Sequence, residues 1–318
     1  MAGFTTSAPD HLIRAQLYSA QLKDILLADL QATTYVDWMT DFPDGTTFNI
    51  PSIGQMEVDD YVEDTPIKYR AFATGNFQFS ITEYLSSGTY ITEKEKQDSY
   101  ISAQIMSQFV PKEHRAIMER VETDILKLGN SQTLSDPNTI NGAAHRFVAS
   151  GSVQQVTVND FAKALYALKK ANVAQTNLIA IVDPSVEYTL NTLTNLVNVQ
   201  NNPKWEGIVA DGIASGMRFV KNVFGFDVYT SQFLADAASE TVSSVSTDST
   251  GKVNLFFSAA GDVKPFKGAW RQMPKVDSKF NQDFQREEYV TTARYGVKLF
   301  RPENLVCVLS NSGSAVIS

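Results

Sequence analysis

A single long helical pattern runs from Thr92 to Leu128 and sets the scale of the whole fold. Pro111 lies within it. Because proline lacks an N–H and clashes with the preceding turn, the helix either kinks there or a second helix begins. We expect the helix to end at Gly129, a residue suited to the position after a helix. One apolar stripe with a charged back predicts a spine on which other elements lie. The stripe residues are Ile101, Ile105, Phe109, Ile117, Val121, Ile125 and Leu128.

A second helical pattern covers residues 10–31, with Asp10 as its N-cap. Two interpretations remain open from the sequence. The segment is either an amphipathic helix that packs on its own core, or an arm that leaves the body and packs on a neighbour. Its apolar residues recur at mixed spacings of three and four: Leu12, Ala15, Leu17, Leu22, Ile25, Leu26 and Leu30.

The segment between these helices is first turn-rich and then strand-like. Asp44-Gly45 is a hairpin-type turn signal, and apolar and acidic residues alternate from Met56 to Tyr84. Within it, Glu57 to Asp64 carries five carboxylates in eight residues. This cluster predicts either a solvated hairpin edge protected by charge or an arm that docks onto a basic neighbour. The apolar strand candidates are Val58, Tyr61, Ile67, Tyr69, Phe72, Phe77, Phe79 and Ile81.

Strands and helices alternate in the following region, which predicts a compact α/β subdomain. A helix capped by Asn159 or Asp160 precedes a short buried strand, Leu178 to Val182. Asp183-Pro184 then opens another helix, because proline suits the first helical turn.

The C-terminal region predicts one loop and several long strands. Residues 235–252 are rich in Ser and Thr without periodicity, so we expect an exposed, mobile loop. Residues 255–260 return as a buried strand or short helix. Met273 to Leu309 alternates strongly and predicts long strands, for which the turn-rich residues 130–156 are the plausible partner.

Composition and charge exclude several classes of protein. The hydrophobic fraction of 43% and charged fraction of 19% are typical of globular chains. One cysteine, Cys307, excludes an intrachain disulfide, and we found neither a secretory signal nor an apolar run long enough to span a membrane. We therefore expect a soluble protein that is made in a cytoplasm.

The distribution of charge is asymmetric. Residues 1–92 contain 12 acidic and four basic residues, which equals the net charge of −8 of the whole chain. Residues 264–301 contain nine basic and four acidic residues, a net charge of +5. An acidic front and a basic back predict association between copies of the chain. The overall negative charge argues against a specific nucleic-acid binder, although the basic and aromatic residues of 264–301 could contact phosphates.

Motifs for catalysis, cofactors and metals are lacking. The sequence contains no GxGxxG after a strand, no CxxC, no HExxH and no GxSxG. We expect His11, His114 and His145 to be surface or capping residues, and neighbouring carboxylates such as Glu122 and Asp124 to be solvated. We therefore predict no catalytic, cofactor-binding or metal-binding residue, and a protein that is not an enzyme.

Three stretches in this order resemble the major capsid proteins of tailed bacteriophages with the Hong Kong 97-like fold. Asp44 to Phe72 resembles the opening of their extended hairpin loop, and Arg115 to Leu126 the end of their spine helix. Ala293 to Leu309, which includes Tyr295-Gly296-Val297 and Arg301-Pro302-Glu303, resembles the closing strand of their peripheral domain.

The resemblance implies an α+β fold with a defined layout. Residues 1–45 would form an N-terminal arm, 46–92 an extended loop, 93–146 and 265–310 a peripheral domain with the spine helix, 147–264 an α/β axial domain, and 311–318 a C-terminal tail.

The same resemblance implies a structural role without a cofactor. Subunits would build hexamers and pentamers of an icosahedral virion capsid around double-stranded DNA, assembled in the host cytoplasm and contacting the DNA non-specifically. Scaffolding and portal proteins and a decoration protein are the implied partners, with no membrane. Some members cross-link a lysine to an asparagine, but no such pair can be matched here.

The charge asymmetry and the resemblance together yield an interface hypothesis. An extended loop cannot bury its apolar side chains alone and becomes ordered when a neighbour covers it. The predicted apolar contacts are Phe48, Ile50, Val58, Tyr61, Ile67 and Phe72. The predicted acidic contacts are Glu57, Asp59, Asp60, Glu63 and Asp64, facing Arg271, Lys275, Lys279, Arg286, Arg294 and Lys298 of a neighbour.

Two alternatives remain at this stage. An encapsulin-like nanocompartment shares the fold and encloses cargo enzymes. A soluble α/β enzyme would instead be a monomer with a closed ligand pocket.

Overall fold

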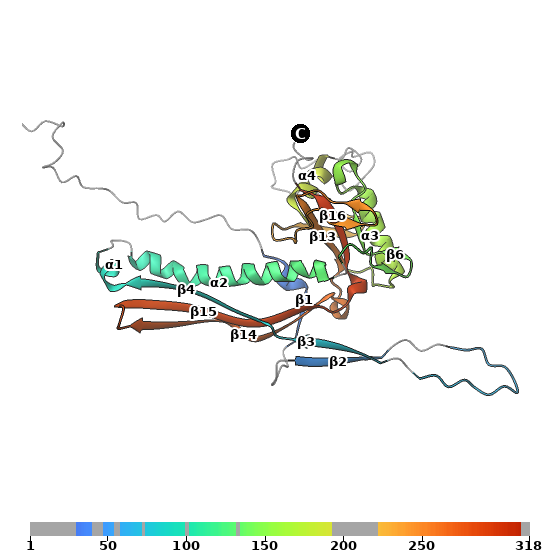
Figure 1. The fold of residues 1–318 in the computed structure, drawn as a ribbon, viewed down its shortest axis with the longest axis horizontal. Coiled ribbons are helices and arrows are strands. Elements are labelled where there is room, and N and C mark those ends of the chain that lie inside the picture. Colours follow the sequence, from blue (N-terminus) through green and yellow to red (C-terminus); the bar gives the residue numbers. More distant parts are fainter. Residues whose placement is uncertain are drawn as a thin grey trace, which may run out of the picture.

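The computed structural model describes residues 30–39, 47–53, 58–71, 74–98, 102–131, 134–192 and 222–312. The helix expected over residues 10–31 lies outside the described residues, except for Leu30 and Gln31, which are not helical. The described parts form an elongated molecule in which a long helix and a long sheet extend from a globular α/β region (Figure 1).

The predicted long helix is confirmed over Ser102–Leu126, and no second helix begins at Pro111. After the short helix α1 (Glu93–Asp98), α2 spans Ser102–Leu126 with Pro111 inside it. A 3₁₀ turn, Lys127–Ser131, follows directly. Gly129 lies in this turn and not in a left-handed position after the helix. Its role is close packing, since a Cβ there would lie 2.6 Å from Leu255 Cδ2.

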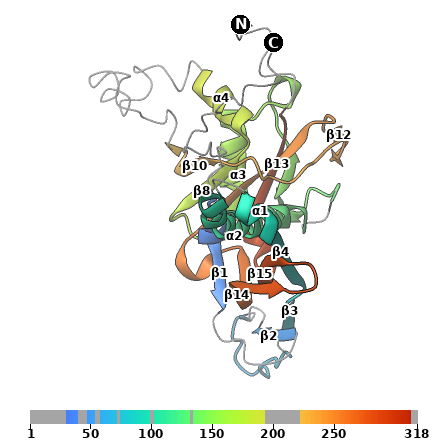
Figure 2. The same cartoon turned by 90° about the vertical axis from the view of Figure 1, so that its left-hand side faces the viewer.

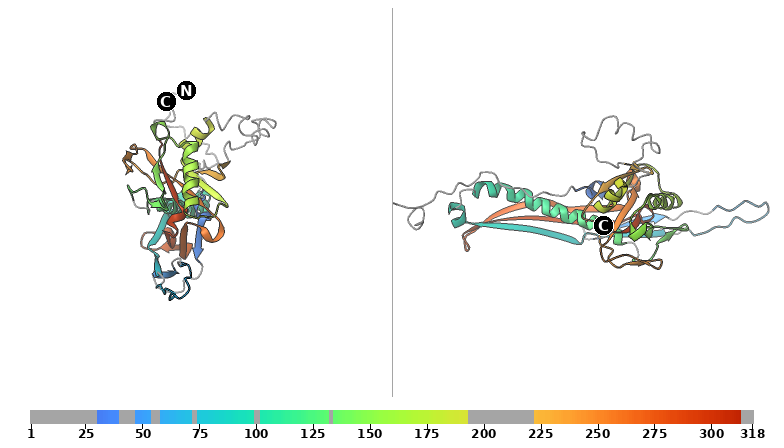
Figure 3. Two further views of the ribbon diagram at one scale, coloured as in Figure 1. Left: turned by 90° about the vertical axis from the view of Figure 1, so that its right-hand side faces the viewer. Right: turned by 90° about the horizontal axis from the view of Figure 1, so that it is seen from above.

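A four-stranded sheet lies along one side of α2 (Figures 1 and 3). Its order is β1 (Val36–Met39), β14 (Phe266–Asn281), β15 (Arg286–Leu299) and β4 (Glu83–Thr92), with β1 parallel and the other pairs antiparallel. Ile117, Val121 and Ile125 of α2 are buried, at the spacing of four that the sequence showed. The predicted long strands are confirmed, but their expected partner is wrong for β14 and β15. These strands pair with each other, because only residues 282–285 separate them along the chain, and their outer edges pair with β1 and β4.

The globular region is built on a six-stranded sheet. Its order is β7 (Arg146–Val148), β16 (Val306–Asn311), β13 (Gly251–Ser258), β8 (Leu178–Val182), β10 (Phe226–Thr230) and β9 (Asn222–Val223). The helices α3 (Val158–Lys170) and α4 (Pro184–Thr192) belong to this region (Figure 2). Ala293 to Leu309, expected to close one domain, is divided: it continues β15 to Leu299, and then enters the other sheet as β16. Only β16 pairs with the turn-rich stretch, through β7.

The apolar run of β8 is explained by burial on both faces of this sheet. Ile179 and Ile181 belong to the hydrophobic cluster that also contains Val121 and Ile125 of α2. Leu178, Ala180 and Val182 belong to the cluster that contains Phe161 and Leu168 of α3. Such strands are continuously apolar and do not alternate. The buried strand and the helix after Asp183 are therefore confirmed.

Two local expectations need correction. The helix α3 begins one residue before Asn159, with Thr157 as its N-cap; Asp160 closes a capping box from the third helical position. Residues 235–252 are not simply an exposed loop, since they contain strands β11 (Thr241–Val242) and β12 (Val245–Ser246). Ala237, Val242 and Thr247 are buried. The Thr247 hydroxyl accepts from the Glu240 N–H over 2.9 Å and donates to the Glu240 carbonyl over 3.1 Å, so it is bonded to the backbone of its own segment.

Two further hairpins lie outside the two large sheets. The turn at Asn141-Gly142, where both residues have positive φ, joins β5 (Thr139–Ile140) to β6 (Ala143–Ala144). A longer hairpin, β2 (Thr47–Ile53) with β3 (Thr74–Ser80), carries residues 58–71 away from the body (Figure 1). The strands expected between Val58 and Tyr69 are absent from these residues, which contain Pro66 and a cluster of like charges and have no strand partner.

Candidate assembly surface

The outer part of the expected extended loop, residues 58–71 and called the loop from here on, exposes large apolar side chains. Val58 is 96% exposed, Tyr61 76% and Ile67 65%. A folded chain normally hides several of these residue types, so a contiguous exposed set marks an interaction surface. On the hairpin that supports the loop, Phe48 is exposed and Ile50 is half-buried. Glu57 and Phe72 lie outside the described residues.

Acidic side chains share this loop. Asp59, Asp60, Glu63 and Asp64 are all exposed. The Asp59 Oδ1 atom lies 2.9 Å from Arg70 Nη2, which bridges the two sides of the loop. The loop therefore presents apolar and acidic groups together to the outside of the subunit.

The structure gathers most of the predicted basic residues on one face of the four-stranded sheet. Thr291 donates to Glu113 of α2 over 2.8 Å, and Tyr295 donates to Asp124 over 2.7 Å, so these positions of β15 face the helix. Because side chains alternate along a strand, the intervening positions point to the opposite face. The positions of β15 that point away from α2 include Arg286, Arg294 and Lys298. Lys275 and Lys279 of β14 pair with Thr292 and Glu288, which point the same way, so these two lysines lie on the same face.

This face, the basic sheet face, also carries acidic and aromatic groups. Lys275 pairs with Asp277 at 2.8 Å and Arg286 with Glu288 at 2.6 Å. The Arg286 guanidinium lies 4.5 Å from the centre of the Tyr90 ring. Arg271 is exposed, but it lies at a break in the β14 register, so alternation does not assign it to this face.

The acidic loop and most of the basic sheet face lie apart in one subunit. The loop extends from one end of the molecule, whereas the β14–β15 turn, near Lys279 and Arg286, lies at the other end (Figure 1). Lys298 is the exception, since its Nζ donates to the Gln78 carbonyl of β3 over 2.9 Å. Lys279 and Arg286 therefore lie at the opposite end of the subunit from the loop, and contact between them and a loop would require a second copy of the chain.

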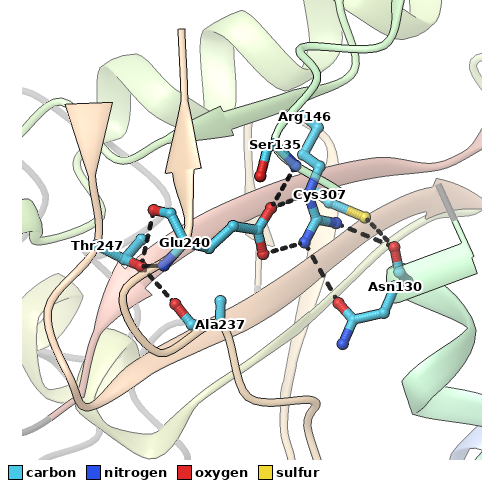
Figure 4. Close-up of polar contacts among 8 residues, drawn as sticks. Asn130, Ser135, Arg146, Ala237, Glu240, Thr247 and Cys307 are labelled. Atoms are coloured by element: carbon cyan, nitrogen blue, oxygen red, sulfur yellow. Dashed lines mark hydrogen bonds and ion pairs between the residues drawn. The ribbon is translucent and has the colours of Figure 1, made fainter. Parts of the chain in front are cut away.

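Sequence reasoning missed a buried junction between the end of α2 and the six-stranded sheet. Arg146 of β7 is fully buried and forms a two-pronged ion pair with Glu240, just before β11 (Figure 4). Arg146 Nη1 also donates to the Gly129 carbonyl over 3.0 Å, and Nη2 to Asn130 Oδ1 over 3.3 Å. One guanidinium thus joins three segments of the chain.

The ionisable groups of this junction stabilise the fold and show no sign of chemical reactivity. Burial tends to raise the pKa of Glu240, but the hydrogen bonds and charge of Arg146 lower it below its usual value. The adjacent Cys307 is fully buried, and burial raises the pKa of its thiol to about 12. A thiol of that kind is inert as a nucleophile.

A second missed residue is Glu122 on α2, which we expected to be solvated but which is buried. Its carboxylate accepts the backbone N–H of Gln31 over 3.0 Å and that of Ala32 over 2.9 Å. It thereby holds the chain where residues 30–35 join the body. Burial raises the pKa of Glu122, although these backbone N–H groups and Arg115 act in the opposite direction.

His145 also differs from expectation, because it is fully buried and not on the surface. Its backbone carbonyl accepts from the Cys307 N–H over 2.8 Å, which brings it into the sheet. His114 is exposed, as expected. Among the described residues, no group of three or more His, Cys, Asp or Glu side chains is placed to hold a metal ion. No helix in the described part of the chain is long and apolar enough to cross a membrane.

Comparison with known proteins identifies the family. A family model described as phage capsid protein matches residues 77–308, well over half of the 318 residues. The chain belongs to the phage capsid protein family. It is therefore a structural protein of the virion capsid and not an enzyme. The match covers α2, the four-stranded sheet except β1, the six-stranded sheet as far as Val308, and the junction at Arg146.

Solved structures support the same fold. The chain of Mycobacterium phage Che8 has a TM-score of 0.68 at 16% identity, with 94% of this chain and 97% of that chain covered. For the mature capsid of bacteriophage PhiM1 the TM-score is 0.73 at 12% identity, with 98% and 95% covered. For the cyanophage Pam1 capsid it is 0.70 at 12% identity, with 99% and 100% covered. At these identities the likeness concerns the fold. No curated protein sequence matches this capsid protein significantly.

Proposed function

We propose that this capsid protein is the major shell subunit of a tailed bacteriophage, with the Hong Kong 97-like fold. It assembles into hexamers and pentamers of an icosahedral shell that encloses double-stranded DNA. The observation that carries the proposal is the extended loop, whose apolar side chains are uncovered in the isolated subunit. Scaffolding and portal proteins are its partners in assembly, with a decoration protein as a further possible addition.

In the proposed layout, α2 and the four-stranded sheet form the peripheral domain. The six-stranded sheet with α3 and α4 forms the axial domain, in which copies meet at the centre of each capsomer. The strand β16 belongs to the sheet of the proposed axial domain, so that domain takes residues 306–310 from the peripheral domain and residue 311 from the C-terminal tail. The Arg146 junction connects the two domains.

The loop of one subunit docks on the basic sheet face of a neighbour. Burial of Val58, Tyr61 and Ile67 supplies adhesion at about 25 cal/mol per Å² before ordering costs are subtracted. Exposed ion pairs contribute about 0–1 kcal/mol each, so the acidic residues set register and partner choice.

The test is charge reversal on each side and then on both. We expect Asp59→Lys with Asp60→Lys to block shell assembly while the subunit stays folded by circular dichroism. Lys275→Glu with Lys279→Glu should do the same. The chain carrying all four changes should recover shells in negative-stain electron microscopy, because the charges are again complementary. Normal shells from either double variant would reject the docking site, and particles filled with protein instead of DNA would favour a nanocompartment.

A further inference from the structure

The turn between β5 and β6 contains Asn141 followed by Gly142, the only Asn-Gly pair in the 318 residues. Both residues are exposed and have positive φ, 49° for Asn141 and 80° for Gly142. Two-residue hairpin turns of this kind favour Asn-Gly, because few other residues adopt positive φ at both positions at low cost. The turn therefore needs the dipeptide from which an asparagine most readily loses its side-chain amide without an enzyme.

The reaction takes place within the turn and needs only water from outside. The backbone nitrogen of Gly142 gives up its proton to solvent and attacks the side-chain carbon Cγ of Asn141. The new N–Cγ bond replaces the Cγ–Nδ2 bond, and the amide group takes up a proton from solvent and leaves as ammonia. Water then hydrolyses the five-membered imide. The product is either aspartate or isoaspartate, in which the backbone runs through the side chain and gains one methylene group.

The attacking nitrogen is accessible in this structure. The hydrogen bond of a two-residue turn joins the residues on either side of it, so the Gly142 N–H does not take part. A Cβ built on Gly142 would meet no atom within 4 Å. Two other asparagines with positive φ, Asn138 and Asn172, differ in this respect. They precede Thr139 and Val173, whose branched side chains crowd the attacking nitrogen.

The side chain of Asn141 also ties the hairpin to helix α3, which lies beside β6 (Figure 1). Its Nδ2 atom donates to the Lys170 carbonyl over 2.9 Å. That carbonyl belongs to the last turn of α3, where carbonyl groups lack a partner within the helix. A carboxylate in place of the amide removes the donor and brings a negative charge to the negative end of the helix dipole. The attractive contact then becomes a repulsive one.

We propose that Asn141 is a site of spontaneous deamidation and that its conversion detaches the β5–β6 hairpin from α3. Isoaspartate adds a further disturbance, because the pairing of Ile140 with Ala143 fixes the turn at two residues. Ala143 is buried in the hydrophobic cluster that contains Leu168 of α3, so a loosened hairpin uncovers this cluster. The inference concerns the single subunit and does not depend on the proposed shell function.

Peptide mapping tests the site. Folded, unassembled subunits are incubated at mildly alkaline pH and digested, and mass spectrometry with fragmentation assigns asparagine, aspartate and isoaspartate at each position. Asn138 and Asn172 are the matched internal controls, since they share the left-handed backbone of Asn141. We expect Asn141 to convert about tenfold faster than either, because glycine alone leaves the nitrogen uncrowded. Similar rates at the three positions, or no conversion at Asn141, would overturn the proposal.

Hydrogen exchange of Asn141→Asp tests the consequence. The control is Asn172→Asp, which places the same charge at an exposed position just beyond α3. We expect the amides of the β5–β6 hairpin to exchange about tenfold faster in Asn141→Asp and at an unchanged rate in the control. Equal acceleration in both variants would show that charge acts without the bond to Lys170. That result, or unchanged exchange in Asn141→Asp, would overturn the proposed detachment.

Discussion

Arg146 and Glu240, 94 positions apart, meet in a two-pronged ion pair in which Nε and Nη2 each lie 2.7 Å from one carboxylate oxygen. Arg146 is fully buried, so its charge depends on this partner. The pair attaches the β11–β12 hairpin to the end of α2, through Gly129 and Asn130 (Figure 4). It therefore links the two regions that the proposed function assigns to separate domains.

Removal of the Glu240 carboxylate should strongly destabilise the subunit. In Glu240→Ala the guanidinium stays buried without its counter-charge, and breaking such a pair costs about 3–5 kcal/mol in the free energy of unfolding. The matched control is Asp236→Ala, which removes the 2.5 Å contact with Lys252 at a carboxylate that is 76% exposed. That change should cost about 1 kcal/mol or less. Chemical denaturation of unassembled subunits measures both, and equal losses would show that Arg146 does not need Glu240.

Gly296 controls how the extended hairpin leaves the body. A Cβ at this position of β15 would lie 2.7 Å from the Ser80 carbonyl oxygen and 3.0 Å from Ile81 Cα. Both contacts are backbone atoms, so they cannot move aside as the end of a side chain can. Gly296→Ala should therefore displace the end of β3 and lower the free energy of unfolding by about 1–3 kcal/mol.

The control for Gly296 is Gly261→Ala, where a Cβ would meet no atom within 4 Å. Hydrogen exchange locates the effect: the amides of β3 should lose protection in Gly296→Ala and keep it in Gly261→Ala. Unchanged protection in both variants would mean that the sheet accommodates the methyl group.

The sequence predicts elements whose cause is local and misses contacts whose cause is distant. The buried strand Leu178 to Val182 and the long helix follow from the residues within each element. Glu122 could not be recognised, because its partners are backbone N–H groups 90 or more positions away. Arg146 is similar, since an isolated arginine in a turn-rich stretch gives no sign of a carboxylate near position 240.

Of the two proposed contact surfaces, the sequence alone could locate the acidic one but not the basic one. The acidic residues of the loop are neighbours in sequence, so composition alone detects them. The basic residues are spread over β14 and β15, and assigning them to a face requires the register. The β14 register shifts between Trp270 and Gln272 and again between Gln272 and Lys275. Gln272 and Lys275 therefore lie on the same face although they are three residues apart, and simple alternation would place them on opposite faces. The prediction of an exposed loop over residues 235–252 was wrong for another reason. Composition cannot distinguish hydroxyls bonded to solvent from those bonded to the backbone.

Loop side chains should affect assembly without affecting the stability of the subunit. Ile67 is 65% exposed, so Ile67→Ser removes little buried area from the isolated chain. We expect the free energy of unfolding to stay within about 0.5 kcal/mol of wild type, while the protein concentration needed for shell formation rises. Light scattering during assembly measures the second quantity. A large loss of subunit stability would instead mean that the loop packs on its own body.

Glu122 should make the subunit less stable as pH rises. Burial raises its pKa in the folded state above the ordinary value of 4.5, so the folded protein binds more protons than the unfolded chain between these two values. Stability then falls with rising pH across that window. Glu122→Gln removes this titration, and the stability difference, wild type minus variant, should decrease as pH rises above 4.5. A difference that increases would show that the backbone bonds outweigh burial.

His145 should make the subunit more stable as pH rises, the opposite of the effect of Glu122. Burial lowers its pKa below the ordinary value of 6.5, so the folded protein binds fewer protons than the unfolded chain between the lowered value and 6.5. Stability then rises with pH across that window, and acidification below pH 6.5 destabilises the subunit. The total pH profile sums the contributions of His145 and Glu122, which have opposite signs. The difference between wild type and His145→Gln isolates the histidine: it should increase as pH rises to 6.5 and stay constant above it. A difference independent of pH between 4.5 and 6.5 would mean that His145 keeps the same pKa in the folded and unfolded chains.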